Sequence, residues 1–68
     1  MDALTITITE ASDQPGYMFD VYTCDAEGVV EGMDSADGGL CTGEIEDALE
    51  MAAIAAKRIL FDNRLRAA

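Results

Sequence analysis

The sequence predicts a small α+β domain, a three-stranded antiparallel β-meander followed by one amphipathic helix packed on one face of the sheet (βββα). Three observations predict this order. The first half of the chain alternates apolar and polar residues, which is the period of a strand, and the second half repeats apolar residues every three or four positions, which is the period of a helix. Turn sequences containing glycine or proline separate the segments. With 68 residues, the chain is expected to form a single acidic domain spanning residues 1–68, with one thin core.

The first strand is predicted at residues 3–9. Leu4, Ile6 and Ile8 point to one side, and three threonines alternate with them on the other. Nearly every residue of this segment is β-branched, which favours an extended backbone. The segment therefore reads as a half-buried strand.

A turn at residues 13–16 should connect this strand to a second one at residues 17–24. The turn contains a Pro-Gly pair, in which glycine supplies the positive φ that a type II turn requires. In the second strand Phe19 and Val21 share one face, and Asp20 lies on the other. We expect the Phe19 face to point inward, because an unpaired carboxylate is costly to bury.

The third strand is predicted at residues 29–33, after a turn at residues 25–28. Residues 34–39 read as a polar, glycine-rich loop, and Leu40 and Cys41 are candidates for further pairing with the sheet.

The helix is predicted at residues 44–62, with Thr42 as its N-cap. Acidic residues in the first turn and basic residues near the other end both suit the helix dipole. The spacing of apolar residues predicts one core-facing stripe. Its members are Ile45, Leu49, Ala52, Ala56, Ile59 and Leu60.

The chain contains two cysteines, Cys24 and Cys41, and no histidine. Two thiols cannot complete a tetrahedral zinc site in one chain. The loop that starts at Asp34 places Ala36 and Ile45 where a calcium-binding EF-hand needs oxygen ligands. We therefore expect no metal and no cofactor. The cysteines read as small core residues, and a disulfide between neighbouring strands stays open as the alternative.

Charge is distributed unevenly along the chain. The formal net charge is −10, yet all four basic residues lie within the last twelve positions. Residues 1–56 carry −13 and residues 57–68 carry +3. Because phosphate backbones repel a protein of this charge, we expect no direct binding to nucleic acid.

The acidic residues cluster at the predicted turns and at the start of the helix. They fit three interpretations: a solvated surface, adaptation to high salt, or a negative surface that engages the positive groove of a nucleic-acid-binding protein. Under the third interpretation the candidate partner-binding residues are Asp25, Glu27, Asp34, Asp37, Glu44, Glu46, Asp47 and Glu50.

A second candidate surface lies on the helix, roughly opposite the core-facing stripe. Ile54, Phe61 and Leu65 fall close together at 100° per residue, where a surface helix is usually polar. One interpretation is that the helix ends before Leu65, which leaves Ile54 and Phe61 as incidental exposed residues or covered by the C-terminal tail. The other is an apolar interface with a partner or with a second copy, flanked by Lys57 and Arg58.

The sequence offers no set of residues for catalysis. Ser12 and Ser35 lie in predicted loops without a base, and the acids that follow Cys41 oppose formation of its thiolate. We therefore expect no enzymatic activity. No signal peptide and no membrane span are expected either, which predicts a cytoplasmic protein.

The segment Gly39-Leu40-Cys41-Thr42-Gly43-Glu44-Ile45-Glu46-Asp47-Ala48-Leu49-Glu50-Met51-Ala52 resembles the strand-to-helix junction of HicB-type antitoxin domains. In that family a Gly-Cys pair and a Thr/Gly segment precede a helix that begins with acids followed by Ala-Leu. The chain departs from the family pattern at residues 34–39, which replace its aromatic and proline-rich stretch. The resemblance implies a partial RNase-H-like sheet and, as one alternative function, an antitoxin module that neutralises a basic toxin.

In size, acidity and single-domain architecture the chain also looks like the small anti-CRISPR proteins of phages, several of which are implied to act as DNA mimics. This resemblance implies a non-enzymatic inhibitor that blocks target-DNA binding by a Cascade-type complex in the host cytoplasm, as a monomer or homodimer. It is the leading functional hypothesis from the sequence. The alternative from a different class is a structural or dimerisation domain that uses the Ile54, Phe61 and Leu65 stripe.

Overall fold

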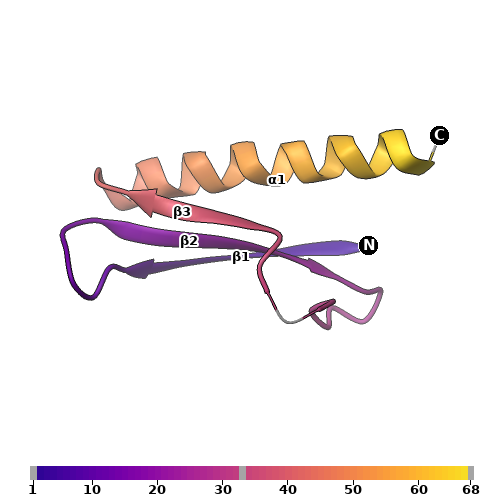
Figure 1. Cartoon of the computed structure of the whole chain (residues 1–68), viewed down its shortest axis with the longest axis horizontal. Helices are drawn as coiled ribbons and strands as arrows, with labels where there is room; N and C mark the ends of the chain where they lie inside the picture. Colours follow the sequence, from indigo (N-terminus) through magenta and orange to yellow (C-terminus); the bar gives the residue numbers. More distant parts are fainter. Residues whose placement is uncertain (1, 33, 68) are drawn as a thin grey trace.

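The described residues of the protein form three antiparallel strands and one long helix, in the order that the sequence predicts (Figure 1). A computed structural model describes residues 2–32 and 34–67, and side chains as far as Asn63. The elements are β1 (Ala3–Glu10), β2 (Tyr17–Cys24), β3 (Asp37–Cys41) and α1 (Ile45–Ala67). The sheet order is β1-β2-β3, and α1 lies across one face of the sheet. The βββα fold class is therefore confirmed.

The hairpin of β1 and β2 matches the predicted pattern closely. Ile8 pairs with Phe19, and Ile6 pairs with Val21, so their apolar side chains share the face beneath the helix. The amide of Ala11 donates to the carbonyl of Gly16 (3.0 Å) and continues this register into the turn. Gly16 has a φ of 118°, and a Cβ there would collide with the carbonyl of Cys41. The turn therefore needs glycine both for its conformation and for its close approach to the end of β3.

The predicted third strand at residues 29–33 is wrong. Within it Val30 forms only an isolated bridge with Cys24, and Met33 lies outside the described residues. The third strand is instead β3, which lies in the segment predicted as a loop. A Cβ on Gly39 would come within 3.2 Å of the Phe19 ring, which is a tight contact, so a glycine packs beside this ring without displacing it. Packing against that ring overrides the low strand propensity of glycine.

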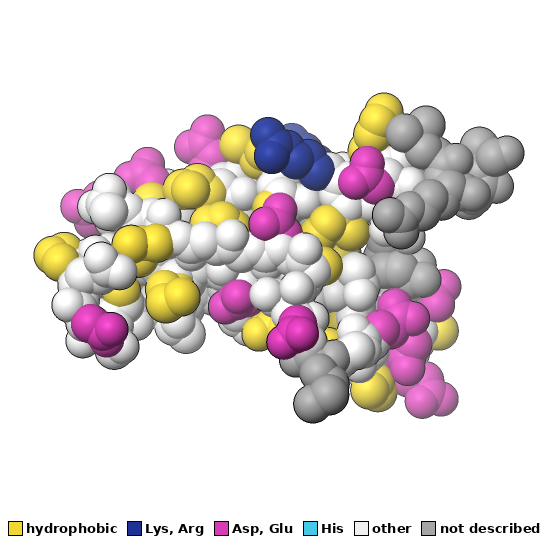
Figure 2. Space-filling model, in the orientation of Figure 1, with side chains coloured by type: hydrophobic (Ala, Val, Ile, Leu, Met, Phe, Trp, Pro, Cys, Tyr) yellow, Lys and Arg dark blue, Asp and Glu magenta, His cyan; other side chains and the backbone are white. Residues whose placement is uncertain are grey.

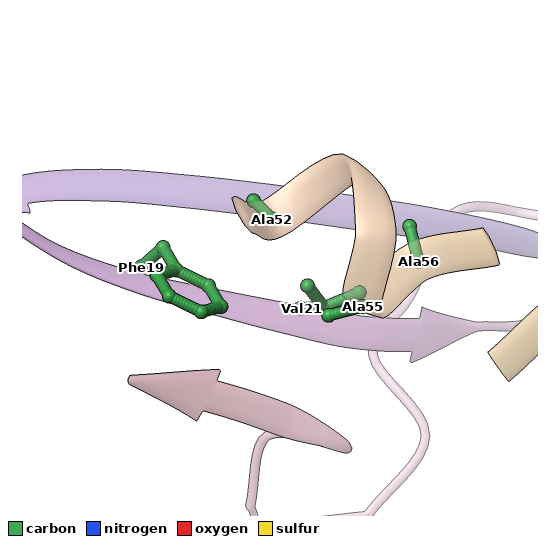
Figure 3. Close-up of a cluster of buried hydrophobic side chains, with 5 residues drawn as sticks. All are labelled: Phe19, Val21, Ala52, Ala55 and Ala56. Carbon is green, nitrogen blue, oxygen red and sulfur yellow. The ribbon is translucent and has the colours of Figure 1, made fainter. Parts of the chain in front are cut away.

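The buried core is small and lies between β2 and α1 (Figure 3). Phe19 and Val21 project from the strand toward Ala52, Ala55 and Ala56 of the helix. The partly buried side chains packed around this cluster are Leu4, Ile8 and Ile59. The prediction that the Phe19 face points inward is confirmed.

The predicted core-facing stripe of the helix is only half correct. Ala52 and Ala56 are buried and Ile59 is half-buried. Three of its larger members are not buried: the exposed fractions are 48% for Ile45, 54% for Leu49 and 37% for Leu60. Ala48 and Ala55 take their place in the core, which corresponds to a rotation of the helix by about 50° at 100° per residue. Phe19 already fills the space below the helix, so the narrow sheet accommodates alanines where leucines were expected.

Both ends of the helix differ from the prediction. Thr42 is not the N-cap, because α1 begins at Ile45 and Glu44 occupies the capping position. The amide of Glu44 donates to Oδ2 of Asp47 (2.8 Å), which is one half of a capping box. The helix also continues beyond Asp62 to Ala67, since no glycine or proline interrupts it.

The two cysteines are buried and free. The sheet register places Cys41 opposite Tyr17, whereas Cys24 lies seven residues further along β2, about 23 Å away at 3.3 Å per residue. A disulfide within the chain is therefore excluded at this distance. The Sγ of Cys24 contacts Oγ1 of Thr5 at 3.3 Å instead.

Candidate protein-binding surface

The predicted acidic residues do not form one continuous surface. Glu44, Glu46, Asp47 and Glu50 lie where β2 begins, whereas Asp25, Glu27 and Asp34 lie in the long connection after β2 ends. The eight residues of β2 separate the two groups by about 23 Å, in a molecule whose longest dimension is 40 Å. Figure 2 shows acidic side chains gathered at both ends of the molecule. Asp37 belongs to neither group, because it pairs with Val21 within the sheet.

Two further acids, Glu10 and Asp13, lie at the same end as the start of the helix. Glu10 ends β1 and Asp13 lies in the following turn, which contacts the end of β3 through Gly16. Neither residue is among the eight candidates predicted from the sequence, although the antiparallel order of the strands brings both to this end. We call the resulting surface the acidic end; its members are Glu10, Asp13, Glu44, Glu46, Asp47 and Glu50, all exposed.

Three of the predicted acids hold the backbone in place. Oδ1 of Asp25 accepts hydrogen bonds from the amides of Glu27 (2.9 Å) and Val29 (3.0 Å), which closes the turn after β2. Oδ1 of Asp37 accepts from the amide of Gly38 (2.8 Å), and Asp47 caps the helix. Asp, unlike Glu, is short enough for such local bonds. These three residues therefore contribute to folding as well as to surface charge.

The glutamates of the acidic end have a different environment. Glu44, Glu46 and Glu50 are exposed, and their carboxylates make no interaction with the residues that the structure describes. The first basic residue along the helix is Lys57, seven residues beyond Glu50 and about 10 Å away at 1.5 Å per residue. Basic side chains gather on the outer side of the helix, away from this end (Figure 2). The negative charge of the acidic end is therefore not neutralised from within the described part of the chain.

The outer side of α1 carries the apolar stripe that the sequence predicted. Ile54 is 48% exposed and Phe61 is 62% exposed, and together with Lys57, Arg58 and Asp62 they line an open groove. The side chain of Leu65 lies outside the described residues. Because the helix continues to Ala67, the interpretation in which it ends before Leu65 is wrong.

A second groove runs between α1 and β3. Its lining residues are Phe19, Asp37, Met51, Ile54, Ala55 and Arg58. Ile54 and Arg58 belong to both grooves, so one apolar strip with basic neighbours extends from the outer side of the helix to the short edge strand.

Within the described residues, no group of three or more Asp, Glu or Cys could hold a metal ion. No helix in the described part of the chain combines the length and the apolar character that a membrane span requires. Comparison of the chain with protein families, with curated proteins and with solved structures gives no match. The described surface offers carboxylates at both ends of the molecule and an apolar, partly basic strip on the helix.

Proposed function

We propose that this protein is a non-enzymatic inhibitor that binds the basic, nucleic-acid-binding surface of another protein through its acidic end. The observation that supports the proposal is the gathering of six exposed carboxylates at one end, with no basic residue of the described chain beside them. Like charges at this density cost free energy in the isolated protein, and a complementary positive surface removes that cost.

The acidic end is similar in extent to a short run of phosphates. Six carboxylates share an end whose cross-section is 20 × 15 Å, and Glu44 and Glu50 are about 9 Å apart along the helix at 1.5 Å per residue. Consecutive phosphates of a DNA strand are about 3.4 Å apart along the helix axis, so six of them span about 17 Å. A site built for a few phosphates of one strand is therefore large enough for the acidic end.

The partner class that we propose is a CRISPR surveillance complex of the Cascade type, inhibited at its DNA-binding channel in the cytoplasm of the host cell. Size, charge and single-domain architecture support this choice, as in the resemblance to small acidic anti-CRISPR proteins. A basic toxin is the alternative partner, because the same carboxylates would fit it equally well.

The decisive experiment compares two charge-reversal variants with equal net charge. The first replaces Glu44, Glu46 and Glu50 by lysine and leaves the capping residue Asp47 intact. The control replaces Asp2, Glu27 and Asp34, three exposed acids away from the acidic end, by lysine. Both variants change the net charge by the same amount, so a difference between them reports position and not total charge.

We expect the wild-type protein and the control to capture a nucleic-acid-binding complex from host lysate at low salt and to compete with its DNA. The acidic-end variant should lose this activity. Capture should also weaken at high salt, because the Debye length falls from about 10 Å at 0.1 M to about 3 Å at 1 M. Capture that survives both high salt and the acidic-end variant would contradict the proposal.

A second candidate function rests on the exposed strip of Ile54 and Phe61. These two large apolar side chains line one open groove, and the basic residues Lys57 and Arg58 lie beside them. Such a combination is typical of a protein-protein interface. Under this alternative the acids only maintain solubility and the protein is a structural or dimerisation domain. Phe61→Asp should then abolish partner binding, whereas the acidic-end variant should leave it intact.

A further inference from the structure

We propose that β1 pairs with β1 of a second copy of this chain around a two-fold axis at Ile6, which joins two three-stranded sheets into one of six strands. β1 is an edge strand of eight residues, because the sheet order is β1-β2-β3. Natural edge strands are usually protected by lysine, proline, a bulge or shortness. The residues of β1 from Ala3 to Thr9 have none of these, since they are uncharged and pair with β2 without interruption, and Glu10 is the one charged residue of the strand.

The opposite edge strand, β3, has features that protect it from pairing with another chain. β3 has only five residues, begins with Asp37 and contains two glycines. Asp37 also lines the groove between β3 and α1, together with Met51 and Arg58. The unprotected edge is therefore a property of β1 and not of the fold as a whole.

The backbone groups of β1 that point away from the sheet can be identified. The amide of Ala36 donates to the carbonyl of Val21, and the amide of Glu31 donates to that of Thr23, so odd-numbered residues of β2 direct their polar groups away from β1. Even-numbered residues of β2 must then bond to Thr5, Thr7 and Thr9 of β1, because the two directions alternate along a strand. The amide and carbonyl groups of Leu4, Ile6 and Ile8 consequently point outward.

These outward groups suit a second copy in one register. With the two-fold axis at Ile6, the residue opposite Ile6 is Ile6 of the other copy, and Leu4 lies opposite Ile8. Each of these pairs can exchange two backbone hydrogen bonds. The register also keeps the apolar side chains of both copies on the face that the helix covers, and the threonines on the opposite face. In the single chain Ile6 is 37% exposed on the helix-covered face. Both the hydrogen bonds and the side-chain pattern are therefore self-complementary.

Charge and area set the strength of this association. β1 from Ala3 to Thr9 is a neutral strip on a chain with a net charge of −10, so it is where two copies can approach with little local repulsion. Asp2 and Glu10 face each other at the ends of the strip and oppose pairing. The eight residues of β1 form an edge about 27 Å long at 3.4 Å per residue. Because the molecule is 15 to 20 Å thick, pairing along this edge buries on the order of 500 Å² per copy. The total of about 1,000 Å² is at the lower limit for a specific interface, so the dimer should form only in concentrated solution.

The test is the mass of the full chain in solution between about 10 µM and about 1 mM, a range that suits micromolar to millimolar dissociation constants. We expect a monomer–dimer equilibrium that shifts toward the dimer as salt rises, because salt screens the repulsion between two acidic copies. This salt dependence is opposite to that of the proposed partner binding, so the two proposals can fail independently. A strict monomer at the highest concentration in high salt would overturn this one.

Two sets of variants test the register. Ile6→Pro removes the outward amide at the axis and should reduce dimer formation at least tenfold, whereas Leu40→Pro at the other edge should not. Because a proline can impair folding, a second pair uses the exposed residues Ala3 and Thr9, which face each other across the axis. A3E/T9E places like charges opposite each other and should weaken the dimer, whereas A3E/T9K should keep it. Equal effects of the two double variants, or a dimer lost only on Phe61→Asp, would assign the interface elsewhere.

Discussion

The two sides of α1 differ in a way that reverses the usual relation between residue size and burial. The side against the sheet is made of Ala48, Ala52, Ala55 and Ala56, all buried. The larger apolar side chains of the helix lie on its flanks and outer side, where Leu49, Ile54 and Phe61 are about half exposed or more. Alanines allow the helix to approach the sheet closely, and they leave most of its apolar surface facing water.

This difference separates the residues that fold the protein from those available for binding. The buried cluster depends on Phe19 and Val21 of β2, because the alanines above them contribute little apolar area of their own. Side chains on the outer side of the helix can change with little effect on folding. The core therefore does not account for the large apolar side chains that are exposed there.

Truncation of the one large side chain in the core should have the largest effect. Phe19→Ala removes a ring that is 5% exposed and lies beneath Ala52. We expect a loss of about 3–5 kcal/mol in the free energy of unfolding, measured by urea denaturation, and this can unfold a domain of such size. A loss below about 1 kcal/mol would show that the core lies elsewhere.

Enlarging the buried side of the helix should have the next largest effect. Ala52 is fully buried, so Ala52→Leu forces the helix away from the sheet and should cost about 1–3 kcal/mol. The matched control is Ala53→Leu, one position further along, where the side chain is only half-buried. Equal losses in urea denaturation of the two variants would contradict the close approach of helix and sheet.

One residue outside the core should also contribute to stability. Asp47 is exposed, but its carboxylate accepts the amide of Glu44, so Asp47→Ala should cost about 1 kcal/mol. Glu46→Ala removes a carboxylate from the same turn without removing a hydrogen bond. It should cost only a few tenths of a kcal/mol through the helix dipole. Thermal denaturation of both variants, followed by circular dichroism, checks this difference.

Truncation on the outer side should have the smallest effect on folding. Phe61 is 62% exposed, so Phe61→Ser should change the free energy of unfolding by less than about 0.5 kcal/mol. The same change removes the larger of the two exposed apolar side chains in the strip of Ile54 and Phe61. A large loss of stability in urea denaturation would mean that this ring takes part in folding and is not an available surface.

The parts of the fold that follow from local pattern were predicted correctly. The alternation in β1 and β2, the inward face of Phe19 and the positive φ of Gly16 all follow from periodicity and backbone conformation. The third strand was placed wrongly because Val29 and Val30 have high strand propensity and the glycines of β3 have low propensity. The close approach of Gly39 to the Phe19 ring favours the glycine segment, and this contact joins residues twenty positions apart, which a local pattern does not include.

In the candidate site, too, the features that depend on one element were predicted and those that depend on several elements were not. Exposure of Ile54 and Phe61 could be read from helical spacing, because it depends on one element alone. The grouping of Glu10 and Asp13 with the start of the helix could not, since it depends on the order and register of three strands. The separation of Asp25, Glu27 and Asp34 from the other acids has the same cause.

The sequence by itself determined the βββα order, the segregation of charge along the chain and the capacity of α1 to present two apolar surfaces. Only the tertiary structure decided which of those surfaces meets the sheet, which segment becomes the third strand and which acids share an end. Periodicity describes one element relative to its own axis. The rotation of that element and the choice of its neighbours depend on the space left by side chains from elsewhere, above all by Phe19.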